Sequence, residues 1–382
     1  MTEARPIVMH VITGLRTGGA ERALLRLVGG GLAREFDTHI VSMEDEGTVG
    51  PRLRDANATV HILKVRDNPV AAFRRLRQLA ATLRPAVVQG WMYHGNLGAL
   101  AAAGTVPGGV PALFNIRQGL DDIAAEKPIT RQVIRLNRLL SRRPVQILYN
   151  SHRSRDQHQT YGFSSRKSRV IPNGFELDQF LPDDRARAAV RRAIGIKEDA
   201  VVVGNFARFH PMKDHAGLLR AANMALGRGL DAHFLLTGRG VSFQSLEFAD
   251  NVDEGWRNRF HIFGDRPDVA EMMQAIDIYA SSSAWGEGFP NVIGEAMASS
   301  RPCIGTDVGD TGRVIGDSGF VVPPSDSGAL ADALVTLGGD AVLRARLGRR
   351  ARNIIEDKFD VDAVANQYIN LYFGVIRDAQ KV

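Results

Sequence analysis

The stretch Ile7-Val8-Met9-His10-Val11-Ile12-Thr13-Gly14-Leu15-Arg16-Thr17-Gly18-Gly19-Ala20-Glu21-Arg22 decides the fold class of this 382-residue chain. Its first six residues form a predicted core strand, and a glycine-rich loop then opens a helix. Gly18 and Gly19 allow close backbone approach, and free amides at the helix start can bind phosphate. The spacing is not Gly-x-Gly-x-x-Gly, so the nicotinamide and flavin fingerprint is not met. The stretch predicts a doubly wound α/β unit, and its loop is either a structural turn or a ligand loop.

The same alternation of apolar runs and helical patterns occurs in two series, which favours two parallel sheets with crossover helices. The first series predicts strands at 7–12, 38–43, 60–63, 86–89, 112–115, 145–149 and 169–171, and helices near 20–34, 70–84, 95–103, 128–142 and 152–160. The second predicts strands at 200–206, 232–237, 260–263, 278–281, 302–305 and 320–322, and a final helix over 361–376. We therefore expect domains at 1–176 and 177–360, with 361–382 as a C-terminal helix.

Length and composition agree with two globular domains. The chain has 44% hydrophobic and 24% charged residues, and it is longer than one hydrophobic core usually supports. Cys303 is the only cysteine, which excludes an intrachain disulfide and a cysteine-based zinc site. The first residues lack a signal-peptide pattern, and the uncharged segment 85–116 is broken by prolines and glycines. We expect a cytoplasmic protein without a transmembrane helix.

The net charge of +6 is an average over two unlike halves. Residues 1–172 contain 25 Lys and Arg against 13 Asp and Glu, whereas residues 173–382 contain 23 against 29. The first half therefore carries +12 and the second half −6. A basic half favours an anionic partner.

Two motifs in the second half suit the binding of a sugar nucleotide. Arg208 and Lys213 follow the predicted strand 200–206, where a guanidinium and an ammonium can clamp a diphosphate. Glu287 and Glu295, with seven residues between them, flank a Gly-Phe-Pro turn that starts a helix. The loop carboxylate can accept sugar hydroxyls, the helix amides can hold phosphate, and the second carboxylate can bind a ribose diol. The alternatives are a solvated basic pair, a surface glutamate and a capping glutamate.

With these motifs, the chain resembles family 4 glycosyltransferases, which are retaining enzymes of the GT-B fold. The resemblance rests on Gly18-Gly19-Ala20-Glu21-Arg22, Val170-Ile171-Pro172-Asn173-Gly174, Arg208 with Lys213, Leu236-Thr237-Gly238-Arg239-Gly240, the two glutamates, and Thr306-Asp307-Val308-Gly309-Asp310. They occur in the family's order over nearly the whole chain. The resemblance implies two Rossmann-like domains that face each other across a cleft, with a C-terminal helix that crosses back to the first domain.

The resemblance also implies the roles of individual residues. The catalytic group would be His94, Glu287, Arg208 and Lys213. Donor-binding residues would be Gly18, Gly19, Arg208, Lys213, Gly238, Phe263, Gly288, Phe289, Asn291, Val292 and Glu295. Glu287 would hold the sugar hydroxyls, Glu295 the ribose, and the region from Phe263 to Asp268 the base.

His94 matches the family histidine beneath the transferred sugar, although a lone histidine usually has a structural explanation. Many members have His-x-His where this chain has Gln89-Gly90-Trp91, so specificity in the first domain can differ. Arg117 ends another predicted strand, where it meets either an acceptor anion or Asp121 and Asp122 of its own loop. Arg117 and Asn173 are the expected acceptor-binding residues.

No Asp-x-Asp lies at a convincing strand end, so we expect neither a metal site nor a cofactor. The donor would be a UDP- or GDP-sugar, and basic side chains and amides would supply the positive field. No carboxylate on the acceptor side is a clear nucleophile. We therefore hypothesise front-face transfer, in which the leaving diphosphate takes the proton of the acceptor hydroxyl.

The predicted helix at 129–143 is basic and amphipathic. Ile129, Val133, Leu136 and Leu140 share one face, and Arg131, Arg135, Arg138 and Arg142 repeat two positions later. Such a helix either lies on anionic lipid or covers the sheet as a solvated crossover. A saccharide acceptor linked to a polyisoprenyl lipid would place the enzyme on the inner face of the plasma membrane.

Three other classes of function compete with this assignment. Nucleic-acid binding is disfavoured because aromatic residues make up only 7% and no nucleic-acid motif is present. A sugar-nucleotide epimerase would turn over its donor without an acceptor. A non-catalytic module would bind the nucleotide without forming a product.

Overall fold

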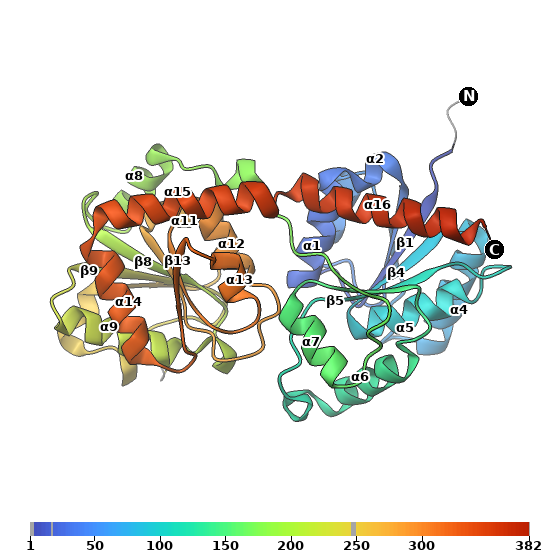
Figure 1. Cartoon of the computed structure of the whole chain (residues 1–382), viewed down its shortest axis with the longest axis horizontal. Coiled ribbons are helices and arrows are strands. Elements are labelled where there is room, and N and C mark those ends of the chain that lie inside the picture. Colours follow the sequence, from blue (N-terminus) through green and yellow to red (C-terminus); the bar gives the residue numbers. More distant parts are fainter. Residues whose placement is uncertain (1–3, 17, 246–249, 382) are drawn as a thin grey trace. The chain divides into compact units, whose positions relative to one another are not determined.

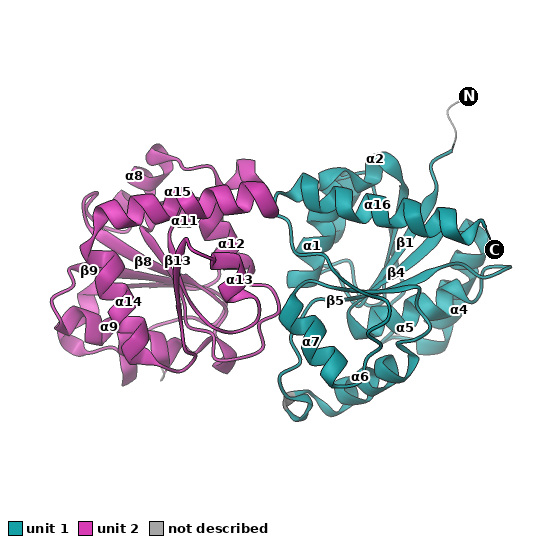
Figure 2. Cartoon of the chain, viewed as in Figure 1, with its two compact units in different colours: residues 1–174, 359–382 teal, residues 175–358 magenta. Residues whose placement is uncertain are grey.

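The computed structural model describes residues 4–16, 18–245 and 250–381, so Thr17 of the glycine-rich loop lies outside it. The chain divides into two compact units (Figure 2). Unit 1 contains residues 1–174 and 359–382, and unit 2 contains residues 175–358. The domain boundaries expected from the sequence, after 176 and after 360, lie two residues from these.

Unit 1 is built on a parallel sheet in the order β3-β2-β1-β4-β5-β6-β7. Figure 1 labels its central strands β1, β4 and β5. Its strands are β1 Ile7–Ile12, β2 Asp37–Ser42, β3 Thr59–Ile62, β4 Val87–Trp91, β5 Ala112–Ile116, β6 Gln146–Tyr149 and β7 Ser168–Val170. Successive side chains of β1 enter different cores: Val8 and Ile12 belong to one cluster, and Met9 and Val11 to another. Both faces of the sheet are therefore covered, as expected for a parallel sheet.

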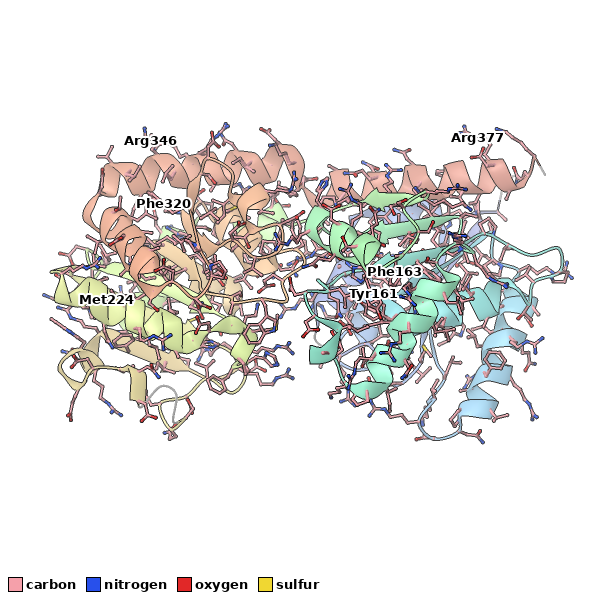
Figure 3. All side chains as sticks on the ribbon, turned by 60° about the horizontal axis from the view of Figure 1, so that its bottom comes forward. Tyr161, Phe163, Met224, Phe320, Arg346 and Arg377 are labelled. Carbon is pink, nitrogen blue, oxygen red and sulfur yellow. The ribbon has the colours of Figure 1, made fainter. Side chains whose placement is uncertain are left out.

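All helices of unit 1 except α16 lie in the crossovers between these strands. They are α1 Gly19–Leu27, η1 Val28–Leu32, α2 Ala33–Glu35, α3 Gly50–Asp55, α4 Pro69–Leu83, α5 Met92–Ala103, η2 Ile123–Ala125, α6 Pro128–Leu140, α7 His152–Thr160 and α16 Val361–Ala379. The predicted helix at 20–34 is interrupted by the π-helical turn η1, where Gly31 has a φ of 113°. After α7, Phe163 packs in a cluster with Tyr93 and Ile147, and the neighbouring Tyr161 lies against its edge (Figure 3).

The C-terminal helix α16 is part of unit 1. Val364, Tyr368 and Tyr372 are buried in the same cluster as Val8 and Leu24. Asp360 caps the helix by accepting hydrogen bonds from two first-turn amides. A helix that follows the whole of unit 2 in sequence therefore completes the core of unit 1.

Helix α6 buries Ile134 and Asn137, and the side-chain amide of Asn137 donates to the carbonyl of Tyr93 at 2.9 Å. On the apolar face predicted from the sequence, Ile129 is 75% exposed and Leu136 is 43% exposed. Within the described residues, no helix is both long and apolar enough to cross a membrane.

Unit 2 repeats the architecture with the parallel order β10-β9-β8-β11-β12-β13. The strands are β8 Val201–Phe206, β9 Ala232–Thr237, β10 Phe260–Phe263, β11 Ile278–Ser281, β12 Cys303–Thr306 and β13 Gly319–Val322. The helices are η3 Leu177–Phe180, α8 Asp184–Ala193, η4 Pro211–Lys213, α9 His215–Gly227, η5 Glu254–Arg259, α11 Val269–Ala275, α12 Asn291–Ala298, α13 Thr311–Ile315, α14 Ser327–Gly339 and α15 Ala341–Lys358.

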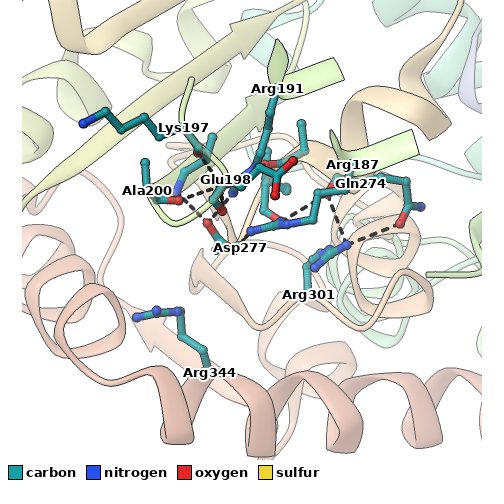
Figure 4. A network of polar contacts seen from close by, with 12 residues as sticks. Arg187, Arg191, Lys197, Glu198, Ala200, Gln274, Asp277, Arg301 and Arg344 are labelled. Atoms are coloured by element: carbon teal, nitrogen blue, oxygen red, sulfur yellow. Dashed lines mark hydrogen bonds and ion pairs between the residues drawn. The ribbon is translucent and has the colours of Figure 1, made fainter. Parts of the chain in front are cut away.

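A buried ionic network holds the amino-terminal edge of this second sheet (Figure 4). Asp277, just before β11, binds Arg187 at 2.6 Å and Arg191 at 2.7 Å, and it also accepts from the Val202 amide at 2.8 Å. Arg191 is fully buried and donates to four backbone carbonyls besides. The network joins α8, β8 and β11.

These two sheets and their helices have the fold class predicted from the sequence, which is two doubly wound α/β units.

Candidate active site

A polar pocket of about 120 Å³ lies at the carboxyl ends of β8 and β11. These adjacent strands stand where the strand order of unit 2 reverses. Open parallel sheets bind ligands at such a switch point. Lining residues that the sequence predicted are Lys213, Glu287, Phe289, Asn291 and Val292.

The centre of the pocket is an ion pair between Lys213 and Glu287. Both side chains are largely buried, with 22% of Lys213 and 15% of Glu287 exposed. The hydroxyl of Ser283 donates to the same carboxylate oxygen, Oε1, at 2.7 Å. The bonds from Lys213 and Ser283 both end on Oε1 of Glu287. Among the described residues no bond is made to Oε2, so this oxygen can accept a hydrogen bond from a ligand.

The loops that carry these residues are fastened to each other. The Ala284 amide donates to the Met212 carbonyl at 2.8 Å, and the Ser282 hydroxyl donates to the Lys213 carbonyl at 2.8 Å. Gly286 has a φ of 76°, and a Cβ atom there would lie 2.9 Å from Met212. The positions of Lys213 and Glu287 are therefore fixed by hydrogen bonds between their two loops as well as by the ion pair itself.

Helix α12 supplies the wall of the pocket. It begins at Asn291, and Pro290 precedes it, as the Gly-Phe-Pro turn predicted. Phe289 is 5% exposed and stacks on Phe175 at 6.1 Å between ring centroids. A Cβ at Gly294 would lie 2.0 Å from the Phe175 ring, so only glycine allows this packing. The first turn of α12 lines the pocket with Asn291, Val292 and Ile293. The free amides of this turn and the helix dipole favour the binding of an anion there.

Five of the donor residues predicted in unit 2 are not part of the pocket lining. Arg208 is exposed, and its Nη2 lies 3.7 Å from Met212 Sδ. Glu295 is 2% exposed and lies in the second turn of α12. Gly288 lies in the loop before this helix, and its carbonyl accepts a hydrogen bond from the Asp310 amide at 3.1 Å. Of the other two, Gly238 directly follows β9 and Phe263 is the last residue of β10.

Gly238 and Phe263 lie toward the edge of the same sheet. Gly238 has a φ of 153°, and a Cβ there would lie 2.0 Å from the Ala207 carbonyl oxygen, so the close approach requires glycine. The half-buried Phe263 ring lies 5.9 Å from the Arg266 guanidinium. Both residues lie at the carboxyl edge that carries the pocket.

In unit 1 the predicted residues Gly18, Gly19, His94 and Arg117 lie after the central strands β1, β4 and β5, and Asn173 lies after the edge strand β7. Gly18 is the N-cap of α1, and Gly19 is the first residue of that helix. His94 lies in the first turn of α5, where partial burial lowers its pKa and the charge of Glu44 opposes the shift. Met92 begins α5 with a φ of 60°, a strained conformation of the kind found at functional sites.

Arg117 binds neither Asp121 nor Asp122. It donates to the Tyr368 hydroxyl at 2.9 Å, to Asn115 Oδ1 at 3.3 Å, and to Asn173 Oδ1. The two predicted acceptor residues, Arg117 and Asn173, are thus in contact.

Sequence reasoning missed several residues of the pocket. Ser283 and Asn205 line it, and so does the buried Tyr279, whose pKa is raised well above its usual value by desolvation. The run Ser281-Ser282-Ser283, which begins at the last residue of a predicted strand, was a usable signal, because polar side chains at strand ends face the ligand edge.

Two family models match this chain. One, described as Glycosyltransferase Family 4, matches residues 17–179, and the other, Glycosyl transferases group 1, matches residues 198–340. The chain belongs to the family 4 glycosyltransferases. The two matches fall on unit 1 and unit 2, respectively.

Curated relatives of this chain align over part of their length. An Escherichia coli UDP-Gal:alpha-D-GlcNAc-diphosphoundecaprenol alpha-1,3-galactosyltransferase is 27% identical over 214 residues, which is 55% of each chain. A Bacillus anthracis N-acetyl-alpha-D-glucosaminyl L-malate synthase is 29% identical over 205 residues, 53% of each chain. The chain thus spans about half the length of the curated relatives it matches.

Solved structures match the chain over nearly its whole length. Anabaena Alr3699/HepE in complex with UDP has a TM-score of 0.82 at 20% identity, covering 97% of this chain and 100% of that one. The sucrose-phosphate synthase of Thermosynechococcus elongatus has a TM-score of 0.77 at 18% identity, covering 98% and 100%. These likenesses establish the GT-B fold.

Proposed function

We propose that this protein is a retaining, hexosyltransferase-type glycosyltransferase that moves a sugar from a nucleotide-diphosphate sugar to a hydroxyl of a saccharide acceptor. The observation that carries the proposal is the pocket in which Lys213 and Glu287 meet at the start of α12. It combines a cation, a carboxylate with a free oxygen and a helix N-terminus, which are the groups that a sugar diphosphate needs.

The residues of the pocket divide the donor between them. Lys213, Arg208 and the first-turn amides of α12 would hold the diphosphate and stabilise its charge as it leaves. Glu287 Oε2 would accept hydroxyls of the transferred sugar, and Glu295 would bind the ribose.

The transfer step is proposed to be independent of a metal or other cofactor. The bond between the anomeric carbon and the phosphate oxygen breaks, and the acceptor oxygen bonds to that carbon on the same face. The acceptor proton passes to the leaving phosphate oxygen. His94 would lie beneath the sugar, and Arg117 and Asn173 would serve the acceptor.

The relatives support the choice of substrates. The E. coli relative is named for a UDP-sugar donor and a diphosphoundecaprenol acceptor, and a Mycobacterium leprae relative, 30% identical over 214 residues, is a phosphatidyl-myo-inositol mannosyltransferase. We propose a UDP- or GDP-sugar as donor and a lipid-linked saccharide as acceptor, in the biosynthesis of a cell-surface polysaccharide or glycolipid.

A lipid-linked acceptor favours peripheral binding to the cytoplasmic face of a membrane. Unit 1 contains 27 Lys and Arg against 16 Asp and Glu. Helix α6 exposes three apolar side chains, Ile129, Leu136 and Leu139, and Leu139 is 76% exposed. Arg135 and Arg138 are exposed on the same helix. Exposed apolar side chains flanked by arginines suit the interface of an anionic bilayer.

A thermal-shift screen against UDP-, GDP- and ADP-sugars tests the donor. We expect one nucleotide class to raise the unfolding temperature, and NMR of the product to show the anomeric configuration of the donor. Product with inverted configuration would contradict the retaining mechanism. Turnover of the donor without an acceptor would favour an epimerase, and binding without any product would favour a non-catalytic module.

Flotation with phosphatidylglycerol and phosphatidylcholine vesicles at two salt concentrations tests the membrane proposal. We expect binding to the anionic vesicles that weakens with salt and is lost when Ile129, Leu136 and Leu139 are replaced by serine. Val342, which is 80% exposed on α15, provides the matched control Val342→Ser. Equal flotation of all variants, or none by the wild type, would rule out binding through α6.

A further inference from the structure

Arg117 lies in a buried polar layer between the sheet of unit 1 and α16. Its guanidinium carbon is 5.3 Å from the centroid of the Trp91 ring, and that ring is fully buried. Trp91 in turn donates to His10 Nδ1 at 3.0 Å. The guanidinium is therefore held by an aromatic face on one side and by hydrogen bonds in its plane.

Three side chains define the direction of this guanidinium. Nη1 donates to the Tyr368 hydroxyl and to Asn115 Oδ1, and Nη2 donates to Asn173 Oδ1. The Tyr368 hydroxyl also accepts from the Asn115 amide at 3.2 Å, which fixes Tyr368 itself. Nε of Arg117 is buried and has no partner among the described residues.

A guanidinium has five N–H groups in one plane. Here three of them are used within the protein, and each of the three partners is uncharged. A cation with neutral partners and unused donors is suited to an anion or a hydroxyl from outside the chain.

We propose that Tyr368 is a positioning residue, which holds Arg117 in the orientation that binds the acceptor. This inference rests on the proposed function and assigns a role in acceptor binding to the C-terminal helix. Tyr368 is 2% exposed, so it acts through Arg117 rather than by contact with the acceptor. The acceptor group that Arg117 would bind is a phosphate or a sugar hydroxyl.

The helix α16 offers a matched control one turn further along. Tyr372 is fully buried, and its hydroxyl donates to Gln89 Oε1 at 2.8 Å. Tyr368→Phe and Tyr372→Phe each remove one buried hydroxyl from the same face of the helix, but only the first releases Arg117. A general loosening of α16 would affect both variants alike.

The test measures the KM for the donor UDP-galactose and for the acceptor α-D-GlcNAc-diphosphoundecaprenol in both variants. We expect Tyr368→Phe to raise the acceptor KM about tenfold relative to Tyr372→Phe, with the donor KM and the melting temperatures of the two variants alike. Equal acceptor KM values in the two variants would overturn the proposal.

Labelling of arginine by phenylglyoxal, read by peptide mass spectrometry, provides a readout that needs no turnover. We expect Arg117 to be labelled faster in Tyr368→Phe than in Tyr372→Phe or the wild type. If the wild type transfers no sugar with these substrates, the proposed function or the choice of substrates is wrong. The labelling rates then test by themselves whether Tyr368 positions Arg117. Equal labelling in all three proteins would overturn it.

Discussion

At the scale of single residues, the side chain with the clearest consequence is Lys213. Its ammonium group is fixed beside Glu287, at the end of a helix that favours anions. We expect Lys213→Ala to lower kcat by about 10²–10³-fold, because the leaving diphosphate loses a preorganised cation. Steady-state kinetics with the donor identified by the thermal-shift screen would measure this loss.

Two further variants sharpen that experiment. Arg208→Ala should cost less than Lys213→Ala, because Arg208 is exposed and lies outside the pocket lining. Lys197→Ala removes an exposed lysine that precedes β8, at the opposite edge of the sheet, and should leave turnover unchanged. Wild-type turnover by Lys213→Ala would refute the proposed role of this residue.

A second residue-scale prediction concerns pH. Burial lowers the pKa of His10 to about 3. The unfolded imidazole binds a proton below its usual pKa of about 6.5, whereas the folded one stays neutral until pH 3, so protonation favours unfolding as the pH falls from 6.5. At pH 5 this linkage costs about 2 kcal/mol of stability relative to neutral pH.

Urea unfolding at pH 7.5 and pH 5 would measure this effect. In His10→Asn, the loss of stability between the two pH values should be smaller than in the wild type by about 2 kcal/mol. The asparagine Oδ1 occupies the position of Nδ1 and can still accept from Trp91, so the comparison isolates the proton. An identical loss in both proteins would contradict a neutral buried His10.

Residue types in sequence identified part of the site but not its geometry. Lys213 and Glu287 could be found because each follows a predicted strand of the same series, and parallel strands present their carboxyl ends at one edge. The contact of Arg117 with Tyr368 could not be predicted, because the two residues are 251 positions apart and nothing local brings them together.

At the scale of elements, the ionic network at Asp277 predicts a large loss of stability. Asp277→Ala would leave Arg191 buried without its counter-charge, and breaking such a pair costs about 3–5 kcal/mol. The pair of Arg350 and Asp317 provides the control, because its side chains are 53% and 69% exposed. Asp317→Ala should cost much less stability than Asp277→Ala, because solvent screens an exposed pair.

Chemical denaturation of both variants would check this prediction. Asp277→Ala should shift the unfolding midpoint strongly, and Asp317→Ala hardly at all. Similar midpoints for the two variants would show that the network contributes no more than a surface ion pair.

The elements themselves were largely predictable. Each predicted strand is found within two residues at either end, because a strand buried on both faces is a short apolar run between turn residues. The helix α3 was missed, because its six residues, Gly50–Asp55, contain a glycine, a proline and three charged side chains. The burial of Asn137 on α6 could not be predicted, because it depends on a hydrogen bond to the carbonyl of Tyr93, which no periodicity reveals.

At the scale of the whole molecule, the discontinuity of unit 1 predicts unequal effects of a truncation. Removal of residues 359–382 takes Tyr368 and Tyr372 out of the core of unit 1, whereas the main core of unit 2 contains residues of 203–337 only. We expect hydrogen exchange to accelerate across 4–174 while UDP binding persists.

Hydrogen exchange by mass spectrometry and calorimetric titration with UDP would test this prediction on the truncated chain. Loss of UDP binding together with the protection of unit 1 would show that unit 2 does not hold its donor pocket alone. Retained protection across 4–174 would show that α16 is dispensable for the core of unit 1.

The same discontinuity sets an order of events during translation. The strands of unit 1 leave the ribosome first, yet the helix that covers β1 and β4 is made only after all of unit 2. During that interval the apolar surface around Val8, Leu24 and Trp91 lacks its final cover. The nascent unit 1 would therefore need chaperones most during this interval, although its strands are synthesised first.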